Sequence, residues 1–156
     1  MTTVQARLDA LGLALPGPYP PHDPLDAVVV HGERARTSGQ LPRDHDGALV
    51  YPGVVGRDLT VEQGAEAARW CALNALSVLR THLGDLDRIE RVLTVLGFVA
   101  SAPGFVEQPT VVDGASRLLH EVFGEAGRHS RSAIGVAALP RGGAVEIEVE
   151  VALRAC

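Results

Sequence analysis

Acidic and apolar side chains alternate near the C-terminal end of the chain. Glu146, Glu148 and Glu150 occupy every second position of the segment 144–153, between valine and isoleucine residues. This period of two predicts a strand with one apolar and one acidic face. A carboxylate removed from water is costly unless it is paired, and Arg131 offers a partner. If the two segments are adjacent antiparallel strands, Arg131 and Glu146 meet in one site. The alternative, which we favour for Glu150, is a solvated outer face.

The first long helix is predicted to begin at Thr60. Thr60 and Gln63 have the spacing of a capping box, apolar residues recur after them at helical period, and Gly84 is a typical C-terminal stop. Before it, residues 1–15 predict a short helix. Residues 16–24 contain five prolines and predict an extended connector.

A second long helix is predicted after Pro109. Thr110 and Asp113 again have capping spacing, apolar residues share one face, and Gly124 ends the pattern. The helix therefore carries an apolar stripe that needs a sheet or another helix to pack against.

Five segments have the composition of strands. They are 27–30 and 35–38 around a turn at 31–33, the long apolar run 88–100, and 132–139 and 144–153 joined by a turn at 140–143. The order β-β-α-β-α-β-β predicts an α+β fold in a single domain, residues 1–156, with both long helices on one face of a mixed sheet. The other face of the central strand is also apolar, and a second copy of the chain could cover it.

Composition narrows the classes of partner. The net charge is −5 and all 14 basic residues are arginine, which argues against nucleic acid as a ligand because phosphate binding needs a concentrated basic patch. No apolar run is long enough to span a bilayer, so we expect no membrane association and a cytoplasmic location. Cys71 and Cys156 lack the spacing of a disulfide framework or a zinc site, and we expect no metal or cofactor.

Four stretches together resemble a known family. Residues 38–42, Ser-Gly-Gln-Leu-Pro, resemble its "SGQxP" element. Residues 56–68 resemble the entry to its first helix, residues 84–92 its "GDLDRVVRV" stretch, and residues 131–147 its C-terminal signature. Their order and spacing cover about residues 25–153. On these motifs the chain is identified as a member of the Rid or YjgF-like family (reactive intermediate/imine deaminases, also called endoribonuclease L-PSP), in a divergent chorismate-mutase-like branch.

The resemblance implies a fold, an assembly and a reaction. The fold is that of bacillus-type chorismate mutase, and the assembly is a homotrimer with clefts between subunits. Arg131 and Glu146 match the family's catalytic positions. The resemblance implies that the arginine binds the carboxylate of an imine or enamine acid and that the glutamate binds the attacking water. Ala133 and Gly39 match positions that line the pocket. Hydrolysis gives a 2-oxo acid and ammonia; tautomerisation of the imine or enamine acid is the alternative reaction, and no cofactor is needed.

Three positions depart from the family pattern. The position of the pocket tyrosine corresponds to Leu25, with Tyr19 nearby in the proline-rich segment as the alternative. The pocket asparagine corresponds to Gly114, and His129 precedes the Ser-Arg pair where the signature has proline or alanine. We include Gly114 and His129 among the substrate-binding candidates. The departures leave open a non-catalytic relative that binds a small carboxylate or a protein. Endoribonuclease activity is disfavoured by the acidic charge, and a shared fold alone does not imply chorismate mutase activity.

Overall fold

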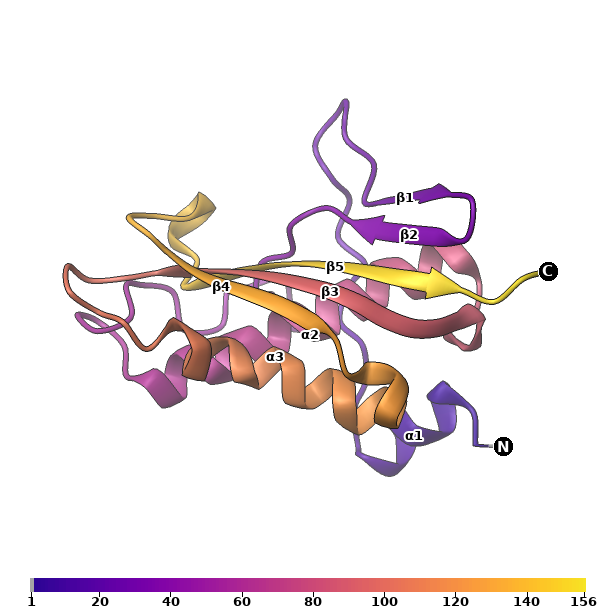
Figure 1. Ribbon diagram of the computed structural model, residues 1–156. Helices are drawn as coiled ribbons and strands as arrows, with labels where there is room; N and C mark the ends of the chain where they lie inside the picture. Colours follow the sequence, from indigo (N-terminus) through magenta and orange to yellow (C-terminus); the bar gives the residue numbers. More distant parts are fainter. Residues whose placement is uncertain (1) are drawn as a thin grey trace.

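A five-stranded mixed sheet with both long helices on one face forms the body of the protein (Figure 1). The computed structural model describes residues 2–156. The helices are α1 (Val4–Ala10), α2 (Val61–Leu83) and α3 (Gln108–Phe123), and the strands are β1 (Val28–His31), β2 (Arg34–Thr37), β3 (Ile89–Ala100), β4 (Ser130–Val136) and β5 (Val145–Leu153). The strand order across the sheet is β1-β2-β5-β3-β4. The expectation of an α+β fold is therefore confirmed. Within residues 2–156, no helix has the length and hydrophobicity to cross a bilayer.

The start and end of α2 agree with the positions predicted from the sequence. The Thr60 hydroxyl accepts a hydrogen bond from the backbone of Gln63, and the Gln63 side chain accepts one from the backbone of Thr60. Gly84 closes the helix with a φ of 83°, a left-handed conformation that glycine adopts at little cost. Between these ends, α2 buries a continuous row of small and aliphatic side chains against α3 and the sheet.

The predicted start of α3 is wrong. The helix begins at Gln108, with Pro109 in its first turn, and Glu107 is the N-cap residue. Proline fits this turn because its missing N–H would have no partner inside the helix. Thr110 and Asp113 thus lie within the helix and do not form the expected capping pair. Asp113 is instead free to contact β4.

The predicted hairpin between the last two strands is also wrong. β3 lies between β4 and β5, pairing parallel with β4 and antiparallel with β5. Because α3 connects β3 to β4, the chain returns to the same end of the sheet and a parallel pair results. Residues 140–143 connect two strands that are not neighbours.

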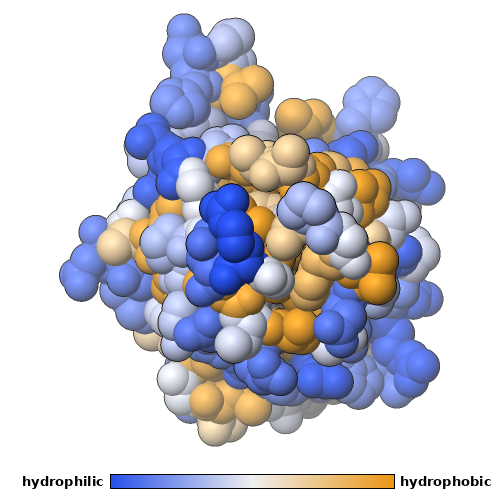
Figure 2. Space-filling view, turned by 90° about the vertical axis from the view of Figure 1, so that its left-hand side faces the viewer, coloured by the Kyte–Doolittle hydropathy of each residue, from blue (hydrophilic) through white to orange (hydrophobic). Residues whose placement is uncertain are grey.

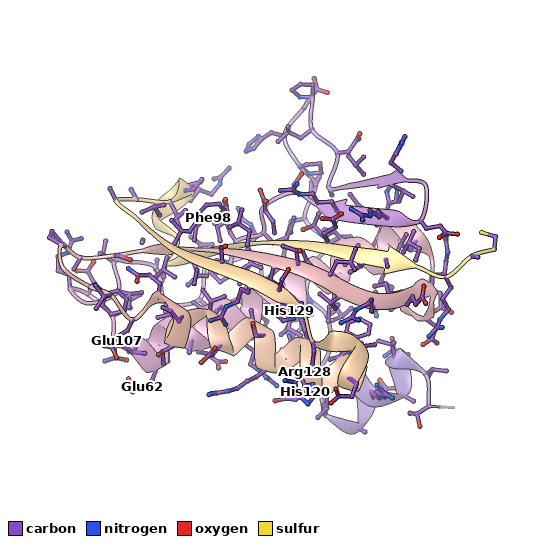
Figure 3. All side chains as sticks on the ribbon, in the orientation of Figure 1. Glu62, Phe98, Glu107, His120, Arg128 and His129 are labelled. Atoms are coloured by element: carbon purple, nitrogen blue, oxygen red, sulfur yellow. The ribbon has the colours of Figure 1, made fainter. Side chains whose placement is uncertain are left out.

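The sheet face away from the helices is uncovered in the single chain. In β5 the valine and isoleucine side chains are buried toward α2 and α3, and the three glutamates lie on the opposite face. Phe98 of β3 projects on that face too (Figure 3). The segment between α1 and β1 passes from the helix layer to this far side, where it projects beyond β1 and β2 (Figure 1).

Candidate functional site

Arg131 is held against α3 by three acceptors. Its Nη1 donates to Asp113 Oδ1 at 2.8 Å and to Ser116 Oγ at 3.2 Å, and its Nη2 donates to the Pro109 carbonyl at 3.2 Å. The Arg131 side chain is only 20% exposed and Asp113 37%. Such a partly enclosed, charge-assisted contact is stronger than a surface ion pair, so the guanidinium has a fixed position.

One edge of this guanidinium remains open. A guanidinium has five N–H donors, and the three hydrogen bonds use both donors of Nη1 and one of Nη2. Within residues 2–156, the Nε–H and the second Nη2 donor have no acceptor. Nε and Nη2 lie side by side, a geometry that matches the two oxygens of a carboxylate. Asp113 thus orients Arg131 and does not occupy its whole binding surface.

His129 continues the network on the other side of Ser116. Its Nδ1 lies 2.6 Å from the Gly127 carbonyl and its Nε2 lies 2.9 Å from Ser116 Oγ. Nδ1 must donate to the carbonyl, so Nε2 of the neutral ring accepts from the serine hydroxyl. Burial lowers the pKa of His129; the bond to Gly127 opposes this shift and the nearby charge of Arg131 adds to it. His129 lies between the start of β4 and α3, near Arg128 and His120 (Figure 3).

Glu146 lies beside Gly39 on the other side of the sheet. A Cβ atom at Gly39 would lie 2.7 Å from Glu146 Oε2, so only glycine allows the carboxylate this position. Burial raises the pKa of Glu146, and the charge of Glu148 raises it further. A carboxyl with a raised pKa exchanges its proton closer to neutral pH than an exposed one does.

Glu146 lines a cavity of about 550 Å³ with residues from α2 and from the segments before β1, after β2 and before β5. The segment before β1 contributes Tyr19 and Leu25, the segment after β2 contributes Gly39 and Arg43, and the segment before β5 contributes Arg141. The remaining lining residues are Asn74 of α2 and Pro20, Pro21, His22, Ala27, Ser38, Gln40, Leu41 and Pro140. This volume is in the range of small-molecule sites, roughly 300–1,000 Å³.

Tyr19 and Leu25 both line this cavity. The Tyr19 hydroxyl donates to the Asp44 carbonyl. Its ring packs under Arg43, and its hydroxyl is engaged with the backbone and not with Glu146.

Arg131 and Glu146 do not meet within one chain. Val95, the β3 residue paired with Arg131, is buried toward the helices, whereas Glu146 pairs with Phe98 on the opposite face. Neighbouring residues across a sheet point to the same side, so the two side chains lie on opposite faces with β3 between them. The expectation that adjacent antiparallel strands unite them in one protomer is therefore wrong.

The other candidate residues do not all lie on one side of the sheet. Gly39 lies beside Glu146. Ala133 shares the helix-facing side of β4 with Arg131 and packs against the core. Gly114 faces α2, where an added Cβ would lie 1.9 Å from the Ala65 carbonyl oxygen. A role for Gly114 in ligand binding stays a prediction; its observed contacts allow the two helices to pack closely.

Sequence reasoning missed Asp113 and Ser116 as partners of Arg131. Asp113, Ser116 and His120 fall at i, i+3 and i+7 of α3, a polar stripe beside the buried apolar one. A polar stripe at the edge of a helix's buried face can contact the element packed beside the helix. The capping spacing of Thr110 and Asp113 masks this stripe in the sequence.

Known proteins match almost the whole chain. The model of the family described as "YjgF/chorismate mutase-like, putative endoribonuclease" matches residues 5–146. The chain belongs to the YjgF/chorismate mutase-like family. The Rid/YjgF resemblance of its motifs is thereby confirmed.

Three relatives illustrate the similarity. Protein TCP17 of Trypanosoma cruzi is 46% identical over 96% of this chain and 94% of its own length. The crystal structure of Atu1372 from Agrobacterium tumefaciens is 41% identical, covering 98% of this chain and 94% of that one, with a TM-score of 0.89. A "putative endoribonuclease" from Shewanella oneidensis is 36% identical, covering 97% and 100%, with a TM-score of 0.93.

Proposed function

We propose that this family member binds a small carboxylic acid in a cleft between subunits of a homotrimer and hydrolyses an imine or enamine acid to a 2-oxo acid and ammonia. The observation that carries the proposal is Arg131, a guanidinium fixed by Asp113 and Ser116 with its Nε/Nη2 edge unpaired. An edge of this kind matches the carboxylate of the substrate. The family resemblance implies that each subunit of this trimer has the fold of bacillus-type chorismate mutase.

The need for two chains follows from the sheet. Arg131 and Glu146 lie on opposite faces of one protomer, so a joint site takes Arg131 from one chain and Glu146 from its neighbour. Exposed apolar side chains favour such an assembly: Ile134 of β4 is 43% exposed and Val29 of β1 is 58% exposed. Apolar surface is also visible on the end of the molecule where β3 leads into α3 (Figure 2), where Val106 is 78% exposed.

Each residue then has one task in the reaction. Arg131 binds the substrate carboxylate and fixes the C=N carbon relative to a water on Glu146. Glu146 accepts a proton from the water as its oxygen bonds to that carbon. That proton passes to the nitrogen and gives a carbinolamine. Glu146 then takes the second proton from the carbinol O–H and passes it to the nitrogen as the C–N bond breaks and the C=O bond forms, so ammonia leaves a 2-oxo acid. His129 contacts Ser116, which in turn holds Arg131, so His129 acts as a positioning residue for Arg131.

A non-catalytic carboxylate-binding protein is the second candidate. The observation that favours it is Tyr19, whose hydroxyl is engaged with the Asp44 carbonyl and offers no donor to the cavity. In this case the protein binds 2-oxo acids and leaves imines unchanged.

The test is turnover of a freshly generated 2-imino acid by the native protein and the Arg131→Ala variant. We expect the native protein to release ammonia, and the variant to lose at least about tenfold in rate because one charged hydrogen-bond pair contributes roughly 1.5–3 kcal/mol. Arg80→Gln is the matched control, since Arg80 contacts Gln5 on the surface. Equal turnover by native protein and Arg131→Ala would refute the assignment. Binding of 2-oxo acids without turnover would favour the second candidate.

A further inference from the structure

The cavity beside Glu146 carries positive charge in an acidic protein. The chain has a net charge of −5, yet two arginines, Arg43 and Arg141, line this cavity and Glu146 is its one acidic lining residue. Among residues 2–156, neither arginine forms an ion pair. A cavity with this balance favours an anionic ligand.

Arg43 is held in place from several directions. Its Nη1 donates to the Gly47 carbonyl at 2.9 Å, and its guanidinium carbon lies 5.6 Å from the centre of the Tyr19 ring. Its own carbonyl accepts a hydrogen bond from Asn74 of α2 at 2.8 Å. An arginine fixed in this way loses little entropy when it binds a ligand, and most of its donors remain available.

Arg141 occupies a backbone conformation that costs energy. Its φ is 59° and its ψ is 17°, in the left-handed region, although glycines follow it at positions 142 and 143. A non-glycine residue pays roughly 1 kcal/mol or more for this conformation. Glycine would adopt it without that cost, so the position of the Arg141 side chain at the cavity needs a reason beyond the turn.

We propose that Arg43 and Arg141 bind a second anionic group of the substrate, so that the protein prefers dicarboxylic 2-oxo and 2-imino acids over monocarboxylic ones. The inference rests on the proposed function, in which Arg131 holds the carboxylate next to the reacting carbon. The second carboxylate then extends into the Glu146 cavity toward Arg43 and Arg141. Two arginines with free donors match its oxygens, as they match those of any carboxylate.

The experiment compares two acids of equal chain length. Isothermal titration calorimetry measures the affinities of 2-oxoglutarate, which has a second carboxylate, and 2-oxovalerate, which lacks it. We expect native protein to bind 2-oxoglutarate about tenfold or more tightly, since a charged hydrogen bond changes affinity by about that factor. This ratio of affinities should fall toward one in Arg43→Gln and in Arg141→Asn. Asparagine suits position 141 because it tolerates the left-handed conformation.

The controls separate this inference from the proposed function. Arg80→Gln should keep the native ratio, because Arg80 lies on α2 and contacts Gln5. A ratio near one in native protein, or a native ratio in both cavity variants, would overturn the dicarboxylate preference. If 2-oxovalerate still bound and Arg131→Ala abolished that binding, the Arg131 carboxylate site of the proposed function would stand without the inference. If neither acid bound, both would fail.

Discussion

The Asp113→Ala substitution tests whether Asp113 orients Arg131 or competes with its ligand. Asp113 Oδ1 lies 2.8 Å from Arg131 Nη1, and it is the one carboxylate paired with this arginine among residues 2–156. A hydrogen bond to a charged group contributes roughly 1.5–3 kcal/mol when it is well enclosed, whereas an exposed ion pair contributes about 0–1 kcal/mol.

The exposures of 20% for Arg131 and 37% for Asp113 place this pair between the two cases. We therefore expect Asp113→Ala to lower the free energy of unfolding by about 1–2 kcal/mol. For a chain of this size each kcal/mol corresponds to about 2–4 °C in Tm. Asp113→Asn keeps an oxygen acceptor at the same place and should lose less, since only the charge is removed.

The binding assay decides between the two roles. If Asp113 orients Arg131, the alanine variant must immobilise the arginine on binding, and its affinity for 2-oxovalerate should fall by about 2- to 10-fold. Asp113→Asn should then bind nearly as well as native protein. If Asp113 competes for the guanidinium, both variants should bind the acid more tightly than native protein does. Tighter binding would refute the account of an oriented arginine.

Two further predictions concern stability. The raised pKa of Glu146 means that the folded chain binds the proton of this carboxyl more tightly than the unfolded chain does. The contribution of Glu146 to the free energy of unfolding is therefore greatest below the unfolded pKa of about 4.3, and it is lost as pH rises through the folded pKa. Glu146→Gln should therefore raise Tm at pH 7 and leave it nearly unchanged at about pH 4; an equal gain at both pH values would contradict the burial argument. Gly114→Ala should lower the free energy of unfolding by roughly 1–3 kcal/mol or more, because the new Cβ would lie 1.9 Å from the Ala65 carbonyl oxygen. In chemical denaturation Gly84→Ala is the control: it has open space around the new Cβ, and its φ of 83° predicts a loss of about 1 kcal/mol. Native stability for Gly114→Ala would contradict the packing account.

Local signals predicted the parts of the fold that local physics determines. The capping box of Thr60 and Gln63 and the stop at Gly84 depend on residues close in sequence, and both were confirmed. The alternation of Glu146, Glu148 and Glu150 correctly identified β5 and its two faces, because side chains of a strand point to opposite sides in turn.

The pairing of the strands could not be predicted from such local signals. The turn at 140–143 suggested a hairpin, but the pairing of β4 depends on its competition with β5 for the edges of β3. β3 is long and buried over much of its length, so it takes an interior position between β5 and β4. Each of the last two strands then pairs with β3 on a different side. No feature of residues 128–153 predicts this pairing, because the partner strand β3 precedes α3 in the sequence.

The same pairing changes what Arg131 and Glu146 can do. Had β4 and β5 been neighbours, the two residues could have formed an ion pair in one chain, and Arg131 would have had little need of Asp113. With β3 between them and their side chains on opposite faces, each has its own environment: the arginine is fixed by α3, and the glutamate is half-buried beside Gly39. Separation leaves both groups available, the arginine with an open edge and the carboxyl with a raised pKa. An arginine and a carboxyl already joined to each other would offer a substrate neither charge nor proton, so the arrangement that sequence reasoning missed is the one that suits a site shared between chains.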